Sequence, residues 1–100
     1  MAAAPTYGYA LHKDQLLKRL ARVEGQVRGI SRMIEDDRYC IDILTQLGAV
    51  STALESLAVE ILDDHVAHCV AGALASGDEH EAEEKTAELL AAVRRFARTR

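Results

Sequence analysis

The sequence predicts an all-α protein, and three observations support this prediction. The chain has 100 residues, a single Pro and only 4% aromatic residues, and it is rich in Ala, Leu and Glu, a composition that favours helices over sandwiches or barrels. Two long stretches place apolar side chains at alternating spacings of four and three residues, which is the pattern of a helix that packs on another helix. A chain of this length has room for one domain with one core.

The first helix is predicted over about residues 11–36, after a flexible N-terminal arm at residues 1–10. Its apolar side chains occupy one narrow side of the helical wheel, and its basic side chains occupy the opposite side. Asp36 and Asp37 interrupt the pattern, so we expect the chain to turn there. The apolar positions are Leu16, Leu20, Val23, Val27, Ile30 and Ile34.

The second helix repeats the same spacing and is predicted over about residues 39–72, a length of about 50 Å. Gly77 is suited to ending the helical run, and Ser76 or Asp78 can cap a third helix at about residues 79–97. We therefore expect one all-helical domain over residues 11–98. The apolar positions of the second helix are Ile43, Leu47, Val50, Leu54, Leu57 and Ile61.

Three helices with narrow apolar stripes do not enclose a core by themselves. A second copy of the chain can cover the stripes, most simply as an antiparallel four-helix bundle made from two copies of the first two helices. The sequence therefore predicts at least a homodimer.

Charge is unevenly distributed along the chain, although the net charge is −4. Residues 1–38 carry seven Lys or Arg against five Asp or Glu, whereas residues 39–100 carry five against eleven. The excess of basic residues lies on the polar side of the first helix, which predicts a local positive surface on an acidic protein. These basic residues are Lys13, Lys18, Arg19, Arg22, Arg28 and Arg32.

Several classes of protein are disfavoured by the sequence. No apolar stretch is long enough to span a membrane, and residues 1–10 lack the pattern of a signal peptide, so we expect a cytoplasmic protein without a membrane partner. No set of nucleophile, base and orienting group and no glycine-rich phosphate loop can be assembled, so an enzyme is not expected. In a reducing compartment the two cysteines favour metal or redox chemistry over a disulfide.

Cys40, His65 and Cys69 form a candidate metal site that one chain cannot close. His65 and Cys69 lie four residues apart and project to the same side of an α-helix. Cys40 lies 25 residues before His65, about 37 Å away along a continuous helix, but on nearly the same side. If two copies of the second helix cross antiparallel near Ala53 or Leu54, Cys40 of one chain meets His65 and Cys69 of the other. One site per chain follows.

Two thiolates and one imidazole form a three-coordinate ligand set, and soft thiolate ligands favour Cu(I). Zn(II) is the competing ion, because it normally takes a fourth ligand, which His68, a carboxylate or water could supply.

Three segments of the sequence resemble the CsoR/RcnR family of bacterial metal-sensing repressors, and the resemblance extends from about Lys13 to Phe96. Within this family, the pattern occupied here by Cys40, His65 and Cys69 resembles that of the Cu(I) sensors. Nickel or cobalt sensors add an N-terminal His, where this chain has Gly8 or Tyr9, and persulfide sensors lack the central His. The segments are Arg22–Ile30, Met33–Gln46 and Asp64–Cys69.

The resemblance implies a dimer of dimers that binds a GC-rich operator without a helix-turn-helix and is released by Cu(I), which derepresses copper efflux or buffering genes. The resemblance implies that the DNA-binding surface involves the basic side chains of the first helix, which are Lys18, Arg19, Arg22, Arg28 and Arg32, with Lys13 beside them. Of these, Arg19 is the DNA-binding position that the resemblance supports best. A basic position that some members have in the middle of the second helix is Ser56 here, so that part of the family's DNA-binding surface is absent or moved.

The resemblance also implies residues that orient the metal ligands without binding the ion. These correspond to Tyr39, beside the first cysteine, and to a glutamate of the third helix, aligned at Glu83 with Glu81 and Glu84 as alternatives. His68 is the third such candidate.

Two other functions remain open from the residues alone. In a redox or electrophile sensor, Cys40 and Cys69 of neighbouring chains would cross-link and His65 would be dispensable. In a copper-buffering protein without a DNA partner, the basic side of the first helix would have no function.

Overall fold

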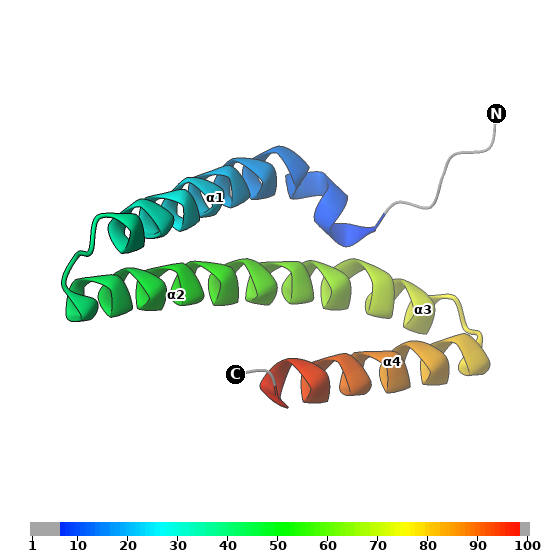
Figure 1. The fold of residues 1–100 in the computed structure, drawn as a ribbon. Helices are drawn as coiled ribbons and strands as arrows, with labels where there is room; N and C mark the ends of the chain where they lie inside the picture. Colours follow the sequence, from blue (N-terminus) through cyan, green and yellow to red (C-terminus); the bar gives the residue numbers. More distant parts are fainter. Residues whose placement is uncertain (1–6, 99–100) are drawn as a thin grey trace. The chain divides into compact units, whose positions relative to one another are not determined.

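The computed structural model describes residues 7–98, and every regular element in this range is helical (Figure 1). The prediction of an all-α fold with three main helices is confirmed. The predicted arm at residues 1–10 lies outside the described residues up to position 6, and Gly8–Ala10 belong to a short 3-10 helix. The elements are η1 (Gly8–His12), α1 (Lys13–Glu35), α2 (Cys40–Asp64), η2 (His65–Val70), α3 (Ala71–Ala75) and α4 (Glu79–Arg98).

The second helical run differs from the prediction in its middle. It continues from residue 40 to residue 75, but η2 is a π-helix between the α-helical segments α2 and α3. At its end, the backbone N–H of Ala71 bonds to the carbonyl oxygen of Val66, five residues earlier. The expectation of a continuous α-helix over 39–72 was therefore wrong, because an i→i+5 turn replaces the α-helical turn at these residues.

The described residues form two compact units, one of residues 9–61 and one of residues 62–98 together with residues 7 and 8. The prediction of one domain over residues 11–98 stays a prediction. No helix in the described part of the chain is long and apolar enough to cross a membrane.

Within the unit of residues 9–61, α1 and α2 form an antiparallel hairpin (Figure 1). Its core takes one apolar residue from every seventh position of each helix, with Ile43 and Ala53 packed against it. Because positions seven apart lie nearly in line along an α-helix, these side chains form one buried column. Its members are Leu16, Val23 and Ile30 from α1 and Val50 and Leu57 from α2.

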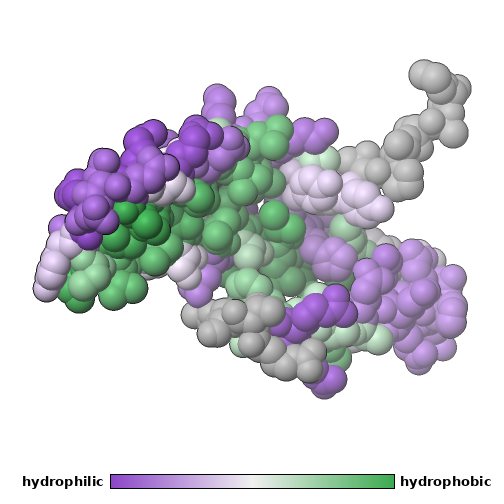
Figure 2. All heavy atoms as spheres, viewed as in Figure 1, coloured by the Kyte–Doolittle hydropathy of each residue, from purple (hydrophilic) through white to green (hydrophobic). Residues whose placement is uncertain are grey.

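The other half of each predicted stripe remains exposed in the single chain. These side chains also recur every seventh residue, and between 41% and 59% of each is accessible to solvent. Figure 2 shows the resulting hydrophobic surface along the hairpin, beside the hydrophilic side of α1. We call this set the exposed column, and it consists of Leu20, Val27, Ile34, Leu47, Leu54 and Ile61.

The turn between α1 and α2 lies where Asp36 and Asp37 predict it. The N–H of Arg38 bonds to the carbonyl of Met33 at 3.0 Å, and that of Asp37 to Ile34 at 3.2 Å, which is the Schellman pattern of a helix C-terminus. Asp37 has a φ of +54°, a left-handed conformation that favours glycine. The carbonyl of Tyr39 then accepts the first hydrogen bonds of α2, from Asp42 and Ile43.

In the second unit, α4 packs against η2 and α3, with Val70 and Ala73 buried. Gly77 has a φ of +78° and ends the preceding helical run. The Asp78 carboxylate accepts hydrogen bonds from the N–H groups of His80 and Glu81 at 3.0 and 3.2 Å, which identifies Asp78 as the N-cap of α4. The predicted end of the helical run at Gly77 is thus confirmed, and of the two predicted caps, Ser76 and Asp78, the structure uses Asp78.

Replacing Asp37 by glycine should stabilise the protein by about 0.5–1 kcal/mol, because glycine adopts a positive φ without the Cβ clash. Urea unfolding followed by circular dichroism measures the change. Asp36→Gly is the matched control, because Asp36 has a φ of −88° and glycine there only adds freedom to the unfolded chain. A lower stability for Asp37→Gly than for wild type would contradict this assignment of the turn.

Candidate metal centre and DNA-binding face

The three predicted metal ligands lie at two places on the second helical run. Cys40 is the first residue of α2 and is exposed, whereas His65 and Cys69 belong to η2 and are half-buried. Both cysteines are free thiols. Each ligand can therefore be approached from outside the chain, which a site shared between subunits requires.

The local geometry of His65 and Cys69 departs from the expectation. Both lie in the π-helix rather than in an α-helix, so their four-residue spacing no longer matches the hydrogen-bond spacing of the turn that holds them. Such π-helical turns within α-helices frequently lie at functional sites. Apolar spacing cannot reveal such a turn, because the pattern is interrupted for only one turn.

The described residues of one chain do not complete a metal site. Within residues 7–98, no group of three His, Cys, Asp or Glu side chains lies close enough together to hold an ion. The assignment of Cys40, His65 and Cys69 as ligands, and of a second chain as the source of Cys40, therefore stays a prediction.

His68 is exposed at the protein surface, but its imidazole bonds to the backbone one turn earlier in the same helical run. Its Nδ1 lies 3.2 Å from the backbone carbonyl oxygen of Asp64. A carbonyl can only accept, so Nδ1 carries the hydrogen and Nε2 points away from this bond. The Asp64 side chain is buried, at 7% exposure. His68 thus fixes the start of η2 next to His65.

The backbone of Gly8 lies against the helix at Asp64 and His68. A Cβ atom at Gly8 would lie 2.2 Å from the carbonyl oxygen of Asp64 and 3.1 Å from the Cβ of His68. Only a glycine allows the backbone to approach so closely. No sequence pattern predicts this contact, because Gly8 is separated from Asp64 by more than fifty residues and belongs to no recognisable turn motif.

Replacing Gly8 by alanine should destabilise the protein by about 1–3 kcal/mol, as for other overpacked contacts. Thermal unfolding measures the loss. Gly72→Ala is the matched control, because a Cβ at Gly72 meets nothing within 4 Å and alanine favours the helix by up to about 1 kcal/mol. Equal effects of the two substitutions would show that Gly8 does not contact the helix at Asp64.

The candidate orienting residues lie apart from these contacts in the single chain. Tyr39 is 66% exposed and precedes Cys40 at the start of α2. Glu83 is exposed on α4, and no hydrogen bond or ion pair joins it to another described residue. Of the alternatives, Glu81 lies 3.4 Å from the Ser76 hydroxyl, which donates to it, and Glu84 is exposed. Their roles toward the metal stay predictions.

The basic side of α1 is mostly open to solvent. Lys18, Arg22, Arg28 and Arg32 are exposed, and Arg28 pairs with Glu24 at 2.8 Å across one turn. Arg19 differs from them, because it is half-buried and its guanidinium donates to side chains of α2. The predicted DNA-binding residues thus fall into four exposed side chains and one that is already engaged.

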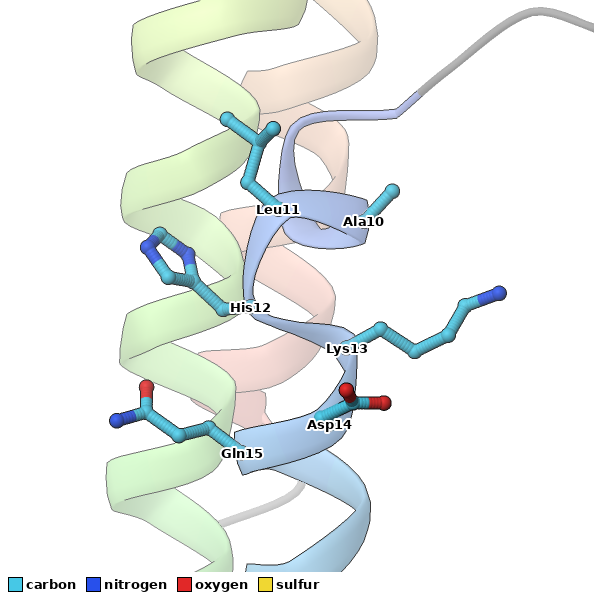
Figure 3. Close-up of a pocket in the computed structure, with 6 residues that line it drawn as sticks. All are labelled: Ala10, Leu11, His12, Lys13, Asp14 and Gln15. Carbon is cyan, nitrogen blue, oxygen red and sulfur yellow. The ribbon is translucent and has the colours of Figure 1, made fainter.

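A shallow depression at the junction of η1 and α1 contains none of the predicted ligands. It is lined by the consecutive residues Ala10–Gln15, whose side chains point to different sides of the turn (Figure 3). No described residue outside this one continuous segment of η1 and α1 is among the residues that line it. We assign no ligand to it.

Comparisons with known proteins agree with the resemblance in the sequence. The model of the family described as metal-sensitive transcriptional repressor matches residues 12–95. The copper-sensing transcriptional repressor RicR of Mycobacterium tuberculosis is 55% identical over 93% of this chain and 96% of its own length. The copper-sensing transcriptional repressor CsoR of Bacillus subtilis is 49% identical over 87% of this chain and 83% of its own length.

Two solved structures are similar to this fold. The crystal structure of the copper-sensing repressor CsoR with Cu(I) from Geobacillus thermodenitrificans superposes with a TM-score of 0.81 at 39% identity, over 97% of this chain and 94% of that one. The nickel-responsive transcriptional regulator InrS superposes with a TM-score of 0.72 at 41% identity, over 83% and 90% of the two chains.

These matches define the chain as an all-helical transcriptional repressor rather than an enzyme. It belongs to the metal-sensitive transcriptional repressor family, which is the CsoR/RcnR family that the sequence motifs resemble. The predicted family is therefore confirmed, and the prediction that the chain is not an enzyme agrees with this membership.

Proposed function

We propose that this chain is a Cu(I)-responsive repressor, which binds operator DNA without metal and leaves it when Cu(I) binds. One observation carries the proposal: two free thiols, Cys40 and Cys69, and the imidazole of His65 are accessible on one helical run of a metal-sensitive repressor. Relatives with similar sequences are named copper-sensing repressors. A protein that acts on chromosomal DNA would work in the cytoplasm.

The ligand set suits Cu(I) better than its competitors. When bound, Cu(I) supplies a soft cation that two thiolates and one imidazole can share in a three-coordinate site. Zn(II) would need a fourth ligand, for which the Nε2 of His68 is the nearest candidate in the sequence. Nickel must also be considered, because one similar structure is that of a nickel-responsive regulator. The experiments below therefore include Zn(II) and Ni(II).

The exposed column supports assembly from two chains. Six apolar side chains in line on the α1–α2 hairpin are the surface that an antiparallel four-helix bundle would bury. Because Cys40 begins α2 and His65 follows its last residue, antiparallel pairing would bring Cys40 to His65 and Cys69 of the partner subunit. Two such sites per dimer give one Cu(I) per chain. A dimer of dimers on a GC-rich operator extends this proposal.

The function is tested by an anaerobic titration of the reduced protein with Cu(I) against a competing chelator. Binding to the DNA upstream of the chain's own coding sequence is followed in the same samples by fluorescence anisotropy. We expect one tightly bound Cu(I) per chain and loss of DNA binding, whereas Zn(II) and Ni(II) should leave the complex intact. DNA release by Cu(I) that persists in Cys40→Ala or His65→Ala would contradict the proposed ligands.

Sharing of the site between subunits is tested by mixing two inactive variants. Cys40→Ala retains His65 and Cys69, and the double variant His65→Ala/Cys69→Ala retains Cys40. After the two are unfolded and refolded together, half of the dimers should be mixed, and each mixed dimer should contain one complete site. About one tight Cu(I) per four chains is then expected. No tight binding in the mixture would indicate that the ligands do not come from two subunits.

The exposed column is tested by Leu54→Asp. Burying one leucine contributes about 1.5–3 kcal/mol, and a substitution acts twice in a twofold dimer, so the dissociation constant should rise at least about 100-fold. Sedimentation equilibrium measures it. Leu44→Asp is the control, because Leu44 is also exposed on α2 but lies outside the column. A dimer unaffected by Leu54→Asp would rule out this interface.

Two rival functions give different results in the same assays. A redox or electrophile sensor would bind Cu(I) weakly, release DNA when oxidised, and tolerate His65→Ala. A copper-buffering protein would bind Cu(I) tightly without any change in DNA binding.

A further inference from the structure

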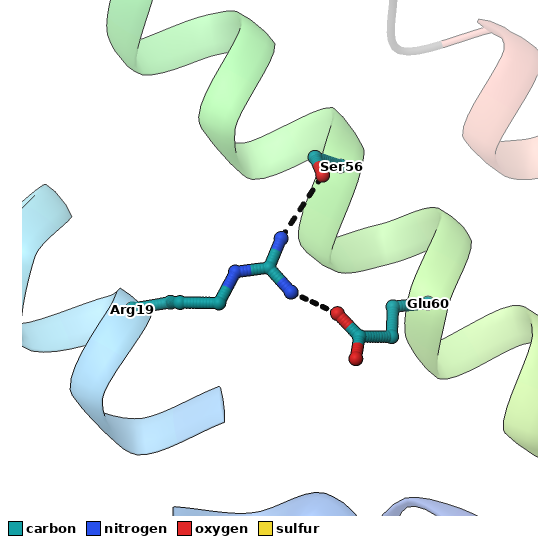
Figure 4. A network of polar contacts seen from close by, with 3 residues as sticks. All are labelled: Arg19, Ser56 and Glu60. Carbon is teal, nitrogen blue, oxygen red and sulfur yellow. Dashed lines mark hydrogen bonds and ion pairs between the residues drawn. The ribbon is translucent and has the colours of Figure 1, made fainter. Parts of the chain in front are cut away.

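Arg19 is held by a pair of side chains on α2 (Figure 4). One terminal nitrogen of its guanidinium donates to a carboxylate oxygen of Glu60, and the other donates to the Ser56 hydroxyl at 2.9 Å. Ser56 and Glu60 are four residues apart, so they lie one above the other on the same side of α2. The planar guanidinium thus meets two acceptors at once, in the way it would meet two oxygens of a phosphate.

This ion pair differs from the other one on α1. Arg28 and Glu24 are 62% and 71% exposed, and a pair of that kind contributes little. The Arg19 and Glu60 side chains are 34% and 32% exposed. The Ser56 hydroxyl is a second acceptor for the Arg19 guanidinium. Arg19 is therefore the predicted DNA-binding residue whose charge is most nearly neutralised within the chain.

We propose that Glu60 is an internal competitor of the DNA backbone for Arg19, and that Ser56 helps to hold the guanidinium beside Glu60. The inference rests on the proposed function, because it requires that the chain bind DNA through α1. A phosphate can engage Arg19 fully only by displacing the Glu60 carboxylate. Glu60 thereby lowers the affinity for DNA, while the exposed Lys18, Arg22 and Arg32 provide attraction that no ion pair with another described residue offsets.

The competition also predicts how salt affects binding. Each phosphate that a protein neutralises makes the logarithm of the binding constant fall by about 0.9 for each tenfold rise in salt. An arginine that already carries a carboxylate partner releases fewer counterions from DNA. Removal of the Glu60 charge should therefore steepen this dependence as well as tighten binding.

The test compares Glu60→Gln with wild type for binding to the DNA upstream of the chain's own coding sequence, at several salt concentrations. Glutamine retains the shape of the side chain and removes the charge. We expect binding about two- to fivefold tighter, as for a partly exposed ion pair, and a salt slope steeper by up to about 0.9. Ser56→Ala should change both quantities in the same direction by less.

Two controls separate competition from a general loss of negative charge. Glu35→Gln removes the charge of an exposed carboxylate on α1 that does not contact Arg19. It should give a smaller gain in DNA affinity and leave the salt slope unchanged. In the Arg19→Ala background, Glu60→Gln should have no more effect than Glu35→Gln. Circular dichroism and the Cu(I) stoichiometry, which should be unchanged, show that each variant is folded.

Three outcomes would overturn the inference. Equal gains in DNA affinity for Glu60→Gln and Glu35→Gln would show that Glu60 acts only through the net charge of the protein. A gain for Glu60→Gln that persists in the Arg19→Ala background would show that Glu60 does not act through Arg19. Unchanged DNA binding in Arg19→Ala would remove the contact for which Glu60 competes. In these cases wild type still binds DNA and the repressor proposal stands. Failure of the wild-type protein to bind DNA would overturn both.

Discussion

The α1–α2 hairpin depends on one buried column of apolar side chains that recurs every seventh residue. Val23 and Ile30 on α1, packed with Val50 and Leu57 on α2, fix how far one helix is shifted along the other, because each side chain fills the space between its neighbours. That axial register brings Arg19 opposite Ser56 and Glu60. A polar contact at the surface is thus determined by packing in the core.

The same seven-residue repeat divides the apolar side chains into a set that is buried within the hairpin and a set that remains exposed. One column is used within the chain, and the exposed column is free for a partner. In the proposed dimer, the metal ligands are also divided, with Cys40 on one chain and His65 and Cys69 on the other. Assembly would therefore come before sensing, because neither the apolar surface nor the ligand set is complete in a single chain.

Sequence reasoning succeeded where a local pattern has one structural solution. The four-three spacing predicts the helices, Asp36 and Asp37 predict the turn, and the pair Ser76 or Asp78 predicts the cap of α4, which is Asp78. It missed the π-helical turn, because the same residues fit either hydrogen-bond spacing. It also missed Glu60 as a partner of Arg19, since the two are 41 residues apart and only the axial register of the hairpin pairs them. The metal ligands came from spacing and resemblance, and the predicted site takes Cys40 from a second chain.

Pairing through the exposed column would also make the stability of this protein depend on its concentration in the cell. If half of the apolar stripe is covered only by a second copy, the free energy of folding contains a term that depends on protein concentration. A newly made chain at low concentration would expose six apolar side chains and be open to proteases and chaperones. The repressor would then have a threshold concentration, below which single chains are degraded faster than they form dimers.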